Sequence, residues 1–243
     1  MSQTATPQQN LRLADHVRAC HVDGQVILLD LRRDRYIGVG GALLPALSAR
    51  IADWPLRAPT PENQTSCSEV DTWITHMRQQ GMLVSASTPP PTRTSIPEPQ
   101  HSLAALDESA RHGIQWRRVA SIAYATLTVG QWLKRLRLAE IVIRVERLRS
   151  AGLSEAAAPS PDQLQGAASW YLRTRPLVMS SHDECLRDSL VMLRFLSAEG
   201  LYPGWVVGVR TRPFGAHSWV QAGSLVLNDL HETVRGYTPI LIV

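Results

Sequence analysis

Residues Glu184–Leu190 read Glu-Cys-Leu-Arg-Asp-Ser-Leu and begin an amphipathic stretch. Leucines at helical spacing predict a helix over residues 183–199, and Gly200 provides its C-terminal signal. Cys185 falls in the first turn, where unpaired backbone N–H groups and the positive end of the helix dipole favour a thiolate. The position therefore suits a nucleophile, and a buried structural cysteine is the alternative interpretation.

The hydrophobic pattern changes to a period of two after this helix, which predicts strands. With a loop of Ala222-Gly223-Ser224, His217 stands directly opposite Asp229, close enough for an imidazole–carboxylate hydrogen bond. A two-residue loop would put the two side chains on opposite faces, so the expected pairing depends on the loop length. The predicted strands are Trp205–Arg210, Ala216–Gln221, Leu225–Asp229 and Ile240–Val243.

Cys185, His217 and Asp229 together supply the parts of a cysteine acyl-transfer site. The thiolate attacks a carbonyl carbon, the imidazole moves the proton, and the carboxylate fixes the imidazole tautomer. The backbone N–H of Cys185 is a candidate oxyanion donor. A surface histidine with a turn aspartate is the structural alternative, and a metal site is disfavoured because the spacings are not typical of zinc. The triad predicts an enzyme that acts on an amide or ester.

The region before Cys185 is predicted to be helical. A short helix is expected over residues 102–112, and apolar periodicity continues over residues 116–149. Ser160-Pro161-Asp162-Gln163 predicts a further helix start, with an N-cap serine, a proline at the first position and a capping-box glutamine. Val119–Leu133 is apolar but short for a membrane span. We interpret it as a core helix rather than a membrane-surface helix and expect no stable membrane insertion.

A proline-rich segment over residues 85–100 divides the chain. Its five prolines lie among serines and threonines, a composition that excludes a helix or a central strand and behaves as a semi-rigid linker. The sequence therefore predicts three parts: a domain over residues 1–84, the linker, and a second domain over residues 101–243.

The first domain is predicted to contain three strands followed by at least two helices, which suits a winged helix-turn-helix. The strands are expected over residues 17–22, 26–31 and 36–39, with Asp23-Gly24 as the first turn. One helix follows Gly40-Gly41, and another runs from Ser68 to Gly81. A small cluster in the first strand is interpreted as structural: His16, Cys20 and His21.

Composition excludes little about partners. The chain has 243 residues and a formal net charge of +4, from 25 basic and 21 acidic residues. This mild charge is typical of a solvated surface and does not by itself indicate nucleic-acid binding. Three cysteines without a CxxC pair make a disulfide framework unexpected, and the polar N-terminus lacks a signal-peptide pattern. We therefore predict a cytoplasmic protein.

The C-terminal motifs resemble those of the lasso peptide biosynthesis B proteins. The resemblance lies in Cys185–Leu190, Gly208–Arg210, Ala216–Val220 and Asn228-Asp229. The family pattern usually reads Ala-His-Ala-Trp-Val-Glu, and this chain has Ser218 and Gln221 at the second alanine and the glutamate. The resemblance implies an α+β fold with a transglutaminase-like or papain-like cysteine peptidase domain. It also implies catalytic roles for Cys185, His217 and Asp229.

The N-terminal part is similar to the precursor-recognition element of the same family. In some lasso pathways the two parts are separate proteins, and this chain resembles the fused form. The resemblance implies that a leader peptide binds as an added strand along an exposed sheet edge, beside a helix. We expect five residues to bind the leader, with ordinary core and edge packing as the alternative: Arg35, Tyr36, Ile37, Trp73 and Met77.

The predicted function is removal of the leader from a ribosomally made lasso precursor, before ring closure by a partner cyclase. The resemblance implies the precursor peptide and an asparagine-synthetase-like cyclase as partners. The triad requires no cofactor, and the sequence does not reveal any nucleotide dependence. An acyltransferase with an amine acceptor is one alternative. A non-catalytic peptide-binding or DNA-binding adaptor is another, although a helix with Arg78 beside Glu69 and Asp71 suits phosphate contacts poorly.

Overall fold

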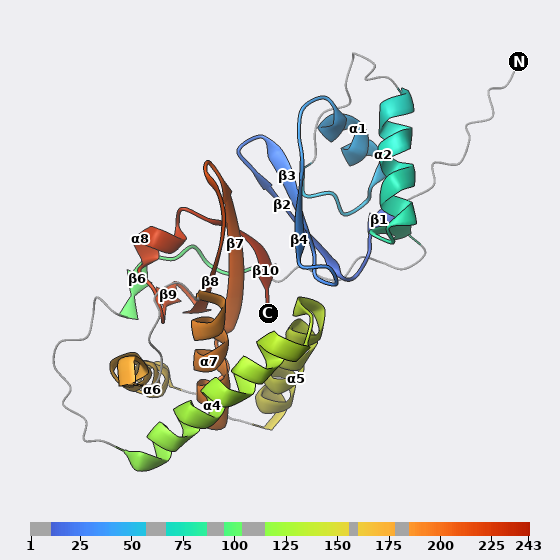
Figure 1. Cartoon of the computed structure of the whole chain (residues 1–243). Coiled ribbons are helices and arrows are strands. Elements are labelled where there is room, and N and C mark those ends of the chain that lie inside the picture. Colours follow the sequence, from blue (N-terminus) through green and yellow to red (C-terminus); the bar gives the residue numbers. More distant parts are fainter. Residues whose placement is uncertain (1–10, 57–66, 87–94, 104–114, 156–159, 178–184) are drawn as a thin grey trace, which may run out of the picture. The chain divides into compact units, whose positions relative to one another are not determined.

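The computed structural model describes residues 11–56, 67–86, 95–103, 115–155, 160–177 and 185–243. The chain forms two compact units, Met1–Arg93 and Thr94–Val243 (Figure 1). The division falls inside the proline-rich segment. Most of the predicted short helix over residues 102–112 lies outside the described residues.

The first unit contains the three strands expected from the sequence. Strands β2 (Val17–Val22), β3 (Gln25–Asp30) and β4 (Arg35–Val39) form an antiparallel sheet in the order β2-β3-β4. Asp23 and Gly24 have φ values of 48° and 73°, and Val22 pairs with Gln25 across them. A hairpin turn with two left-handed residues matches the twist of the strands, which explains the Asp-Gly pair.

A second small sheet of the first unit escaped sequence analysis. Strands β1 (Leu11–Leu13) and β5 (Leu83–Ser85) pair antiparallel, and each is too short to show a period. The helices are α1 (Leu43–Arg50) and α2 (Cys67–Gln79). The core takes one face of each element and includes Val26, Leu28, Leu47, Val70, Ile74 and Met77. The winged helix-turn-helix assignment of this unit stays a prediction.

The second unit begins earlier than its predicted boundary. Within residues 95–100, the Pro97 carbonyl accepts a hydrogen bond from Gln221 Nε2, and the Gln100 N–H donates to Ser224 O. Strand β6 (His101–Ser102) then pairs parallel with β9 (Leu225–Val226), where a helix start was expected. The C-terminal end of the predicted linker is therefore part of this unit.

A five-stranded sheet has the order β10-β7-β8-β9-β6. Strands β7 (Gly204–Thr211), β8 (Phe214–Ala222) and β10 (Thr238–Ile242) are antiparallel to their neighbours and agree with the predicted strands. Strand β9 ends at Val226 rather than at Asp229. A short helix, α8 (His231–Val234), follows it. The early end of β9 determines the geometry of the site described below.

The helical region contains a break that the apolar periodicity over residues 116–149 did not locate. The periodic stretch over residues 116–149 is two helices, α4 (Trp116–Arg135) and α5 (Leu138–Glu155). The Arg137 N–H donates to the Glu140 side chain at 2.9 Å, which caps the second helix at the break. Helix α6 (Pro161–Thr174) begins as predicted, with Ser160 and Gln163 forming a capping box, and a short 3₁₀ turn (Arg175–Leu177) follows.

Helix α4 is amphipathic rather than fully buried. It buries Ile122, Ala125 and Val129, whereas Tyr124 and Leu127 are 60% and 69% exposed. The prediction of a core helix over Val119–Leu133 therefore holds for one face only. Among the described residues, no helix is both long enough and apolar enough to cross a membrane.

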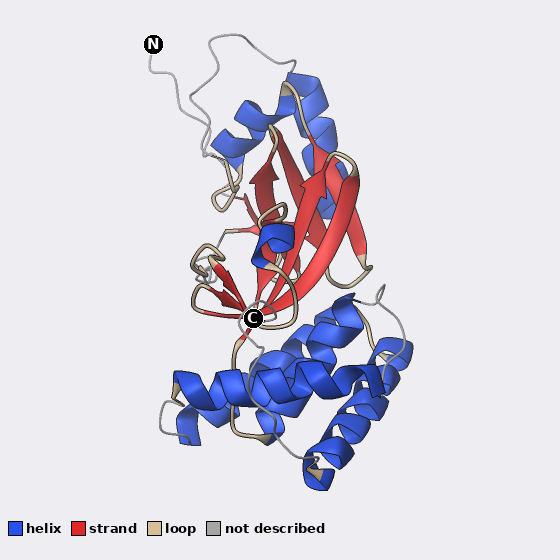
Figure 2. Ribbon diagram, turned by 90° about the vertical axis from the view of Figure 1, so that its left-hand side faces the viewer, coloured by secondary structure: helices blue, strands red, loops and turns tan. Residues whose placement is uncertain are grey.

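Helix α7 (Cys185–Ala198) is the central element of the second unit. It contacts α4, α5 and α6 on one side and strands β7 and β8 on the other. Figure 2 shows the long helices of this unit gathered on one side of its strands. Leu190, Val191, Phe195 and Leu196 are almost fully buried along α7. Burial on several sides fixes the position of the first turn, where Cys185 lies.

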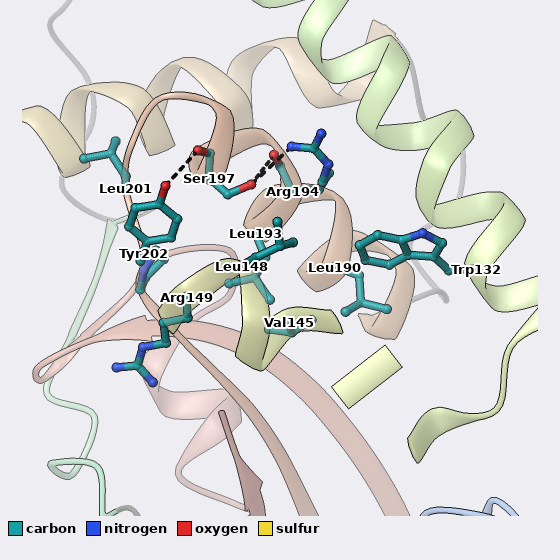
Figure 3. A pocket seen from close by; sticks show the side chains of 11 residues that line it. Trp132, Val145, Leu148, Arg149, Leu190, Leu193, Arg194, Ser197, Leu201 and Tyr202 are labelled. Carbon is teal, nitrogen blue, oxygen red and sulfur yellow. Dashed lines mark hydrogen bonds between the residues drawn. The ribbon is translucent and has the colours of Figure 1, made fainter. Parts of the chain in front are cut away.

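A small cavity lies between α4, α5 and α7, with Trp132, Val145, Leu190 and Tyr202 among its lining residues (Figure 3). Its volume of about 20 Å³ leaves room for roughly one water molecule. Tyr202 enters this region because Gly152 on α5 has no side chain. A Cβ at Gly152 would lie 1.8 Å from Tyr202 Cζ.

We predict that Gly152→Ala lowers the free energy of unfolding by about 1–2 kcal/mol, because Tyr202 must leave its packed position. Gly166→Ala on α6 is the matched control, since a Cβ there meets no atom within 4 Å. The control gains about 0.5–1 kcal/mol from helix propensity. Urea denaturation of both variants measures the difference. Equal stabilisation of the two variants would contradict the packing argument.

Candidate active site

Cys185 is the first residue of α7 and is partly exposed. His217 forms a side-chain hydrogen bond with the thiol, and the backbone N–H groups of Ser218 and Leu186 donate to its sulfur. These donors, with the hydrogen bond to His217 first, lower the pKa of Cys185 against the opposing effect of burial. The structure therefore favours the thiolate form at this helix end.

His217 lies on β8 between the thiol and a carboxylate. Its Nε2 is 2.5 Å from Asp229 Oδ2, which leaves Nδ1 for Cys185. The hydrogen bond to Asp229, and then the one to Cys185, raise the pKa of His217 to about 9. The three side chains predicted from the sequence therefore lie in one chain of contacts: thiol, imidazole, carboxylate.

Two aromatic rings lie near the imidazole. The His217 ring centroid is 5.1 Å from that of Tyr237 and 6.2 Å from that of Trp219. Gly208 on β7 pairs with His217, and a Cβ at Gly208 would lie within 2.9 Å of both aromatic side chains. The absence of a side chain at this position is thus a requirement of the packing around the imidazole. Sequence analysis did not identify Tyr237, because no periodic pattern marks this residue between α8 and β10.

The His217–Asp229 contact does not form in the way that the sequence suggested. Strands β8 and β9 pair Gln221 with Val226 and Ala222 with Leu225, so the loop has two residues rather than three. Such a register would put His217 and Asp229 on opposite faces if β9 continued. The contact exists because β9 ends at Val226 and the chain turns before Asp229. The predicted partner is present, and the predicted register was wrong.

A cavity of about 560 Å³ opens beside the thiol. It lies between α4 and the first turn of α7. Its described lining carries two cations, Lys134 and Arg187, together with apolar and neutral polar side chains. The cavity falls within the size range of small-ligand sites, which is about 300–1,000 Å³. The lining residues are Thr126, Leu127, Gly130, Gln131, Leu133, Lys134, Cys185, Leu186 and Arg187.

Comparison with known families covers the same part of the chain. Residues 124–242 match the family model described as the transglutaminase-like superfamily. These residues form a transglutaminase-like domain. The domain contains the helix with Cys185 and the strands with His217, so the match agrees with the α+β fold expected for this half of the chain.

One curated relative of the chain is the microcin J25-processing protein McjB of Escherichia coli. The alignment has 44% identity over 46 residues and covers 19% of this chain and 22% of the McjB sequence. The chain thus spans about a fifth of that relative's length. No solved structure matches the chain.

The five predicted leader-binding residues lie in the first unit, three of them on strand β4 and two on helix α2. Arg35, Tyr36 and Ile37 are on β4, an edge strand of its sheet. Arg35 is exposed, whereas Ile37 packs against the hydrophobic core. Trp73 is partly buried on α2, and its ring packs edge-on against Trp54 with centroids 6.0 Å apart.

Met77 is a correction to the predicted leader-binding set. Its side chain is only 4% exposed and belongs to the core of the first unit. Val70, Ile74 and Met77 follow helical spacing and point to the same buried side of α2. The residue therefore packs against the core and has no surface for a peptide.

The described residues contain no group of three or more histidine, cysteine, aspartate or glutamate side chains that could hold a metal ion. In the predicted structural cluster, Cys20 is buried and His21 is exposed. His16 is 3.9 Å from Asp30, and burial lowers the pKa of His16.

We predict that iodoacetamide alkylates Cys185 at a pH well below the ordinary pKa of a thiol, about 8.5. The lowered pKa of Cys185 and the raised pKa of His217 both favour a thiolate–imidazolium pair. Asp229→Asn removes the charge that raises the pKa of His217, so the alkylation curve moves to higher pH. Mass spectrometry of the peptide that contains Cys185 measures the rate.

Asp162→Asn is the control for this experiment, because it removes an exposed carboxylate from the start of α6. The curve of this variant should stay where the parent curve lies. A parent curve at the position of a free thiol would contradict the proposed ion pair.

Proposed function

We propose that the chain is a cysteine peptidase that removes the leader from a ribosomally made lasso peptide precursor. The observation that carries the proposal is the contact chain Cys185–His217–Asp229 beside a large cavity. The match to the transglutaminase-like superfamily supports acyl chemistry at a cysteine. The name of the E. coli relative, a microcin-processing protein, supports a peptide as the substrate.

In the proposed reaction, the Cys185 thiolate attacks the carbonyl carbon at the leader–core junction. The C–N bond breaks, the His217 imidazolium gives its proton to the leaving amine, and a thioester remains on Cys185. His217 then takes a proton from water, the hydroxide attacks the thioester, and the thiolate leaves. Asp229 holds the imidazole ring and stabilises its charged form. The products are two free peptides.

The cavity beside Cys185 suits an extended peptide segment. Its volume of about 560 Å³ exceeds that of a single side chain, and it reaches the sulfur from the α4 side. Exposed Leu127 on α4 adds apolar surface at the same place. A peptide that occupies this cavity leaves the other side of the thiol to His217.

The first unit is proposed to bind the leader. Strand β4 pairs with β3 on one side, and no described strand pairs with its other side. Main-chain hydrogen bonds along such an edge bind an extended peptide. Holding the leader in the same molecule raises the concentration of the scissile bond near Cys185. The resemblance to lasso B proteins adds an asparagine-synthetase-like cyclase as the proposed partner for ring closure.

We predict that Cys185→Ala abolishes cleavage of the precursor, because Cys185 is the thiol that His217 contacts. Cys20→Ala, which changes a buried thiol in the first unit, should keep the parent rate. Mass spectrometry of the reaction mixture measures the products. Two free fragments support hydrolysis, whereas an adduct with an added amine would assign an acyltransferase. Cleavage of the precursor by the Cys185→Ala variant would contradict the proposal.

We predict that Arg35→Glu weakens recognition of the leader and not the chemistry. Arg35 is exposed on edge strand β4, so the charge reversal acts on a bound peptide without disturbing the core. We expect KM for the full precursor to rise about tenfold, a change of about 1.4 kcal/mol in binding. Steady-state kinetics should show an unchanged rate with a short peptide that contains only the cleavage site.

Arg18→Glu, on the opposite edge strand β2, is the charge control for Arg35→Glu, although it also removes the hydrogen bonds from Arg18 Nη1 to the Asp15 and Val17 carbonyls. It makes the same change in net charge and should leave KM for the precursor unchanged. An equal rise in KM for both variants would contradict leader binding at β4.

A further inference from the structure

We propose that Asn228 and Asp188 are positioning residues, whose hydrogen bond makes the chain leave strand β9 so that Asp229 reaches His217. The inference rests on the proposed function for its meaning in catalysis. The hydrogen bonds that carry it involve four segments: α6, α7, β8 and the residues after β9. None of these hydrogen bonds involves Cys185, His217 or Asp229 directly.

The register of β8 and β9 would place Asp229 on the wrong face of the sheet if β9 continued. Continued beyond Val226, the observed pairing would put Leu230 opposite His217 and Asp229 opposite Ser218. Neighbouring residues of a strand point to opposite faces, so Asp229 would face away from the imidazole. The 2.5 Å contact between His217 and Asp229 therefore requires a departure from the strand at residues 227–228.

The side chain of Asn228 takes the place of the next strand carbonyl. The Leu227 N–H still donates to Val220 O at 2.9 Å, as in a regular antiparallel pair. The reciprocal bond is different, because the Val220 N–H donates to Asn228 Oδ1 at 2.8 Å. Strand β8 thus keeps its hydrogen bond while the backbone of the partner turns away.

The other end of the Asn228 amide is held by helix α7. Its Nδ2 donates to Asp188 Oδ2 at 2.9 Å and to Ser189 Oγ at 3.2 Å. Asp188 follows Cys185 by three residues, about one helical turn. The helix that carries the nucleophile therefore also holds the segment that carries the acid.

Asp188 is itself fixed by two donors from the end of α6 and the turn after it. Tyr171 donates its hydroxyl to Asp188 Oδ1 at 2.9 Å, and Arg175 Nη1 lies 2.9 Å from Asp188 Oδ2. The Asp188 side chain is only 13% exposed. Burial, and then the charge of Asp188, raise the pKa of Tyr171, so its hydroxyl stays a donor. Because the Asp188 carboxylate is held in this way, it fixes the position of the Asn228 side-chain amide.

The first test is the rate of Cys185 alkylation by iodoacetamide as a function of pH in the full chain. Asn228→Asp places a carboxylate at position 228 against that of Asp188. The two repel each other, so residues 227–229 move and the hydrogen bond between Asp229 and His217 is lost. We expect the alkylation curve to move to higher pH, with a rate at pH 6 lower by about fivefold, as for a thiol without its imidazolium. The groups around His217 stay the same in the variant: Cys185, Tyr237 and Arg210, which lies over the Tyr237 ring.

Exchanging the two side chains gives a rescue that a merely structural role would not produce. In Asp188→Asn/Asn228→Asp the amide at 188 donates to the carboxylate at 228, which still accepts from the Val220 N–H. We expect the double variant to return the curve most of the way to the parent. Asp188→Asn alone, which keeps a neutral acceptor for Asn228, should cause a smaller shift and serves if Asn228→Asp does not fold.

Gly152→Ala is the control for lost stability, because it lies on α5 and should leave the curve unchanged. A parent-like curve for Asn228→Asp, or a double variant no better than that single variant, would overturn the proposal. Cleavage of the precursor is measured in parallel, and Asn228→Asp should lower kcat by about 100-fold, as for a misplaced catalytic group. Alkylation of Cys185 needs no peptide substrate. If the variants shift the pH dependence of alkylation as expected but the parent protein does not cleave the precursor, the proposed function is rejected and the positioning role is kept.

Discussion

The hydrogen bond between His217 and Asp229 depends on an interruption of the sheet. Strand register alone would separate the two side chains, and the early end of β9 brings them within 2.5 Å. The imidazole receives its raised pKa from this contact, and the thiol receives its lowered pKa from the imidazole. The electrostatics of the whole site therefore follow from one local departure from regular structure.

Helix α7 connects that departure with the nucleophile. Its first turn holds Cys185, where the Leu186 N–H meets the sulfur, and its next turn holds Asp188. Its buried residues pack against α4, α5, α6 and the sheet, which fixes both turns relative to β8. A helix packed on several sides is rigid, and rigidity of the support is what a catalytic geometry requires.

The two units carry different kinds of candidate site. The transglutaminase-like domain contains a connected set of ionisable groups and a cavity at the thiol. The first unit offers an edge strand and a compact core. Catalysis in one unit and peptide recognition in the other is therefore the division of roles that we propose.

Local patterns in the sequence were sufficient for most elements. The Asp23-Gly24 hairpin turn, the capping box at Ser160 and the periodicity of α7 each depend on neighbouring residues only. Short elements such as β1 and β5 were missed because a strand of three residues shows no period. Met77 was assigned to the wrong role because helical spacing does not say which face meets the core.

The sequence by itself determined the three reactive residue types, their order and the helix end that favours a thiolate. Only the tertiary structure decided how His217 meets Asp229, because the loop length and the end of β9 set the register. In our proposal that end depends on Asn228, whose partner Asp188 lies 40 residues earlier in the chain. Contacts between residues far apart in sequence leave no periodic signal, so folding must bring them together before they can be recognised.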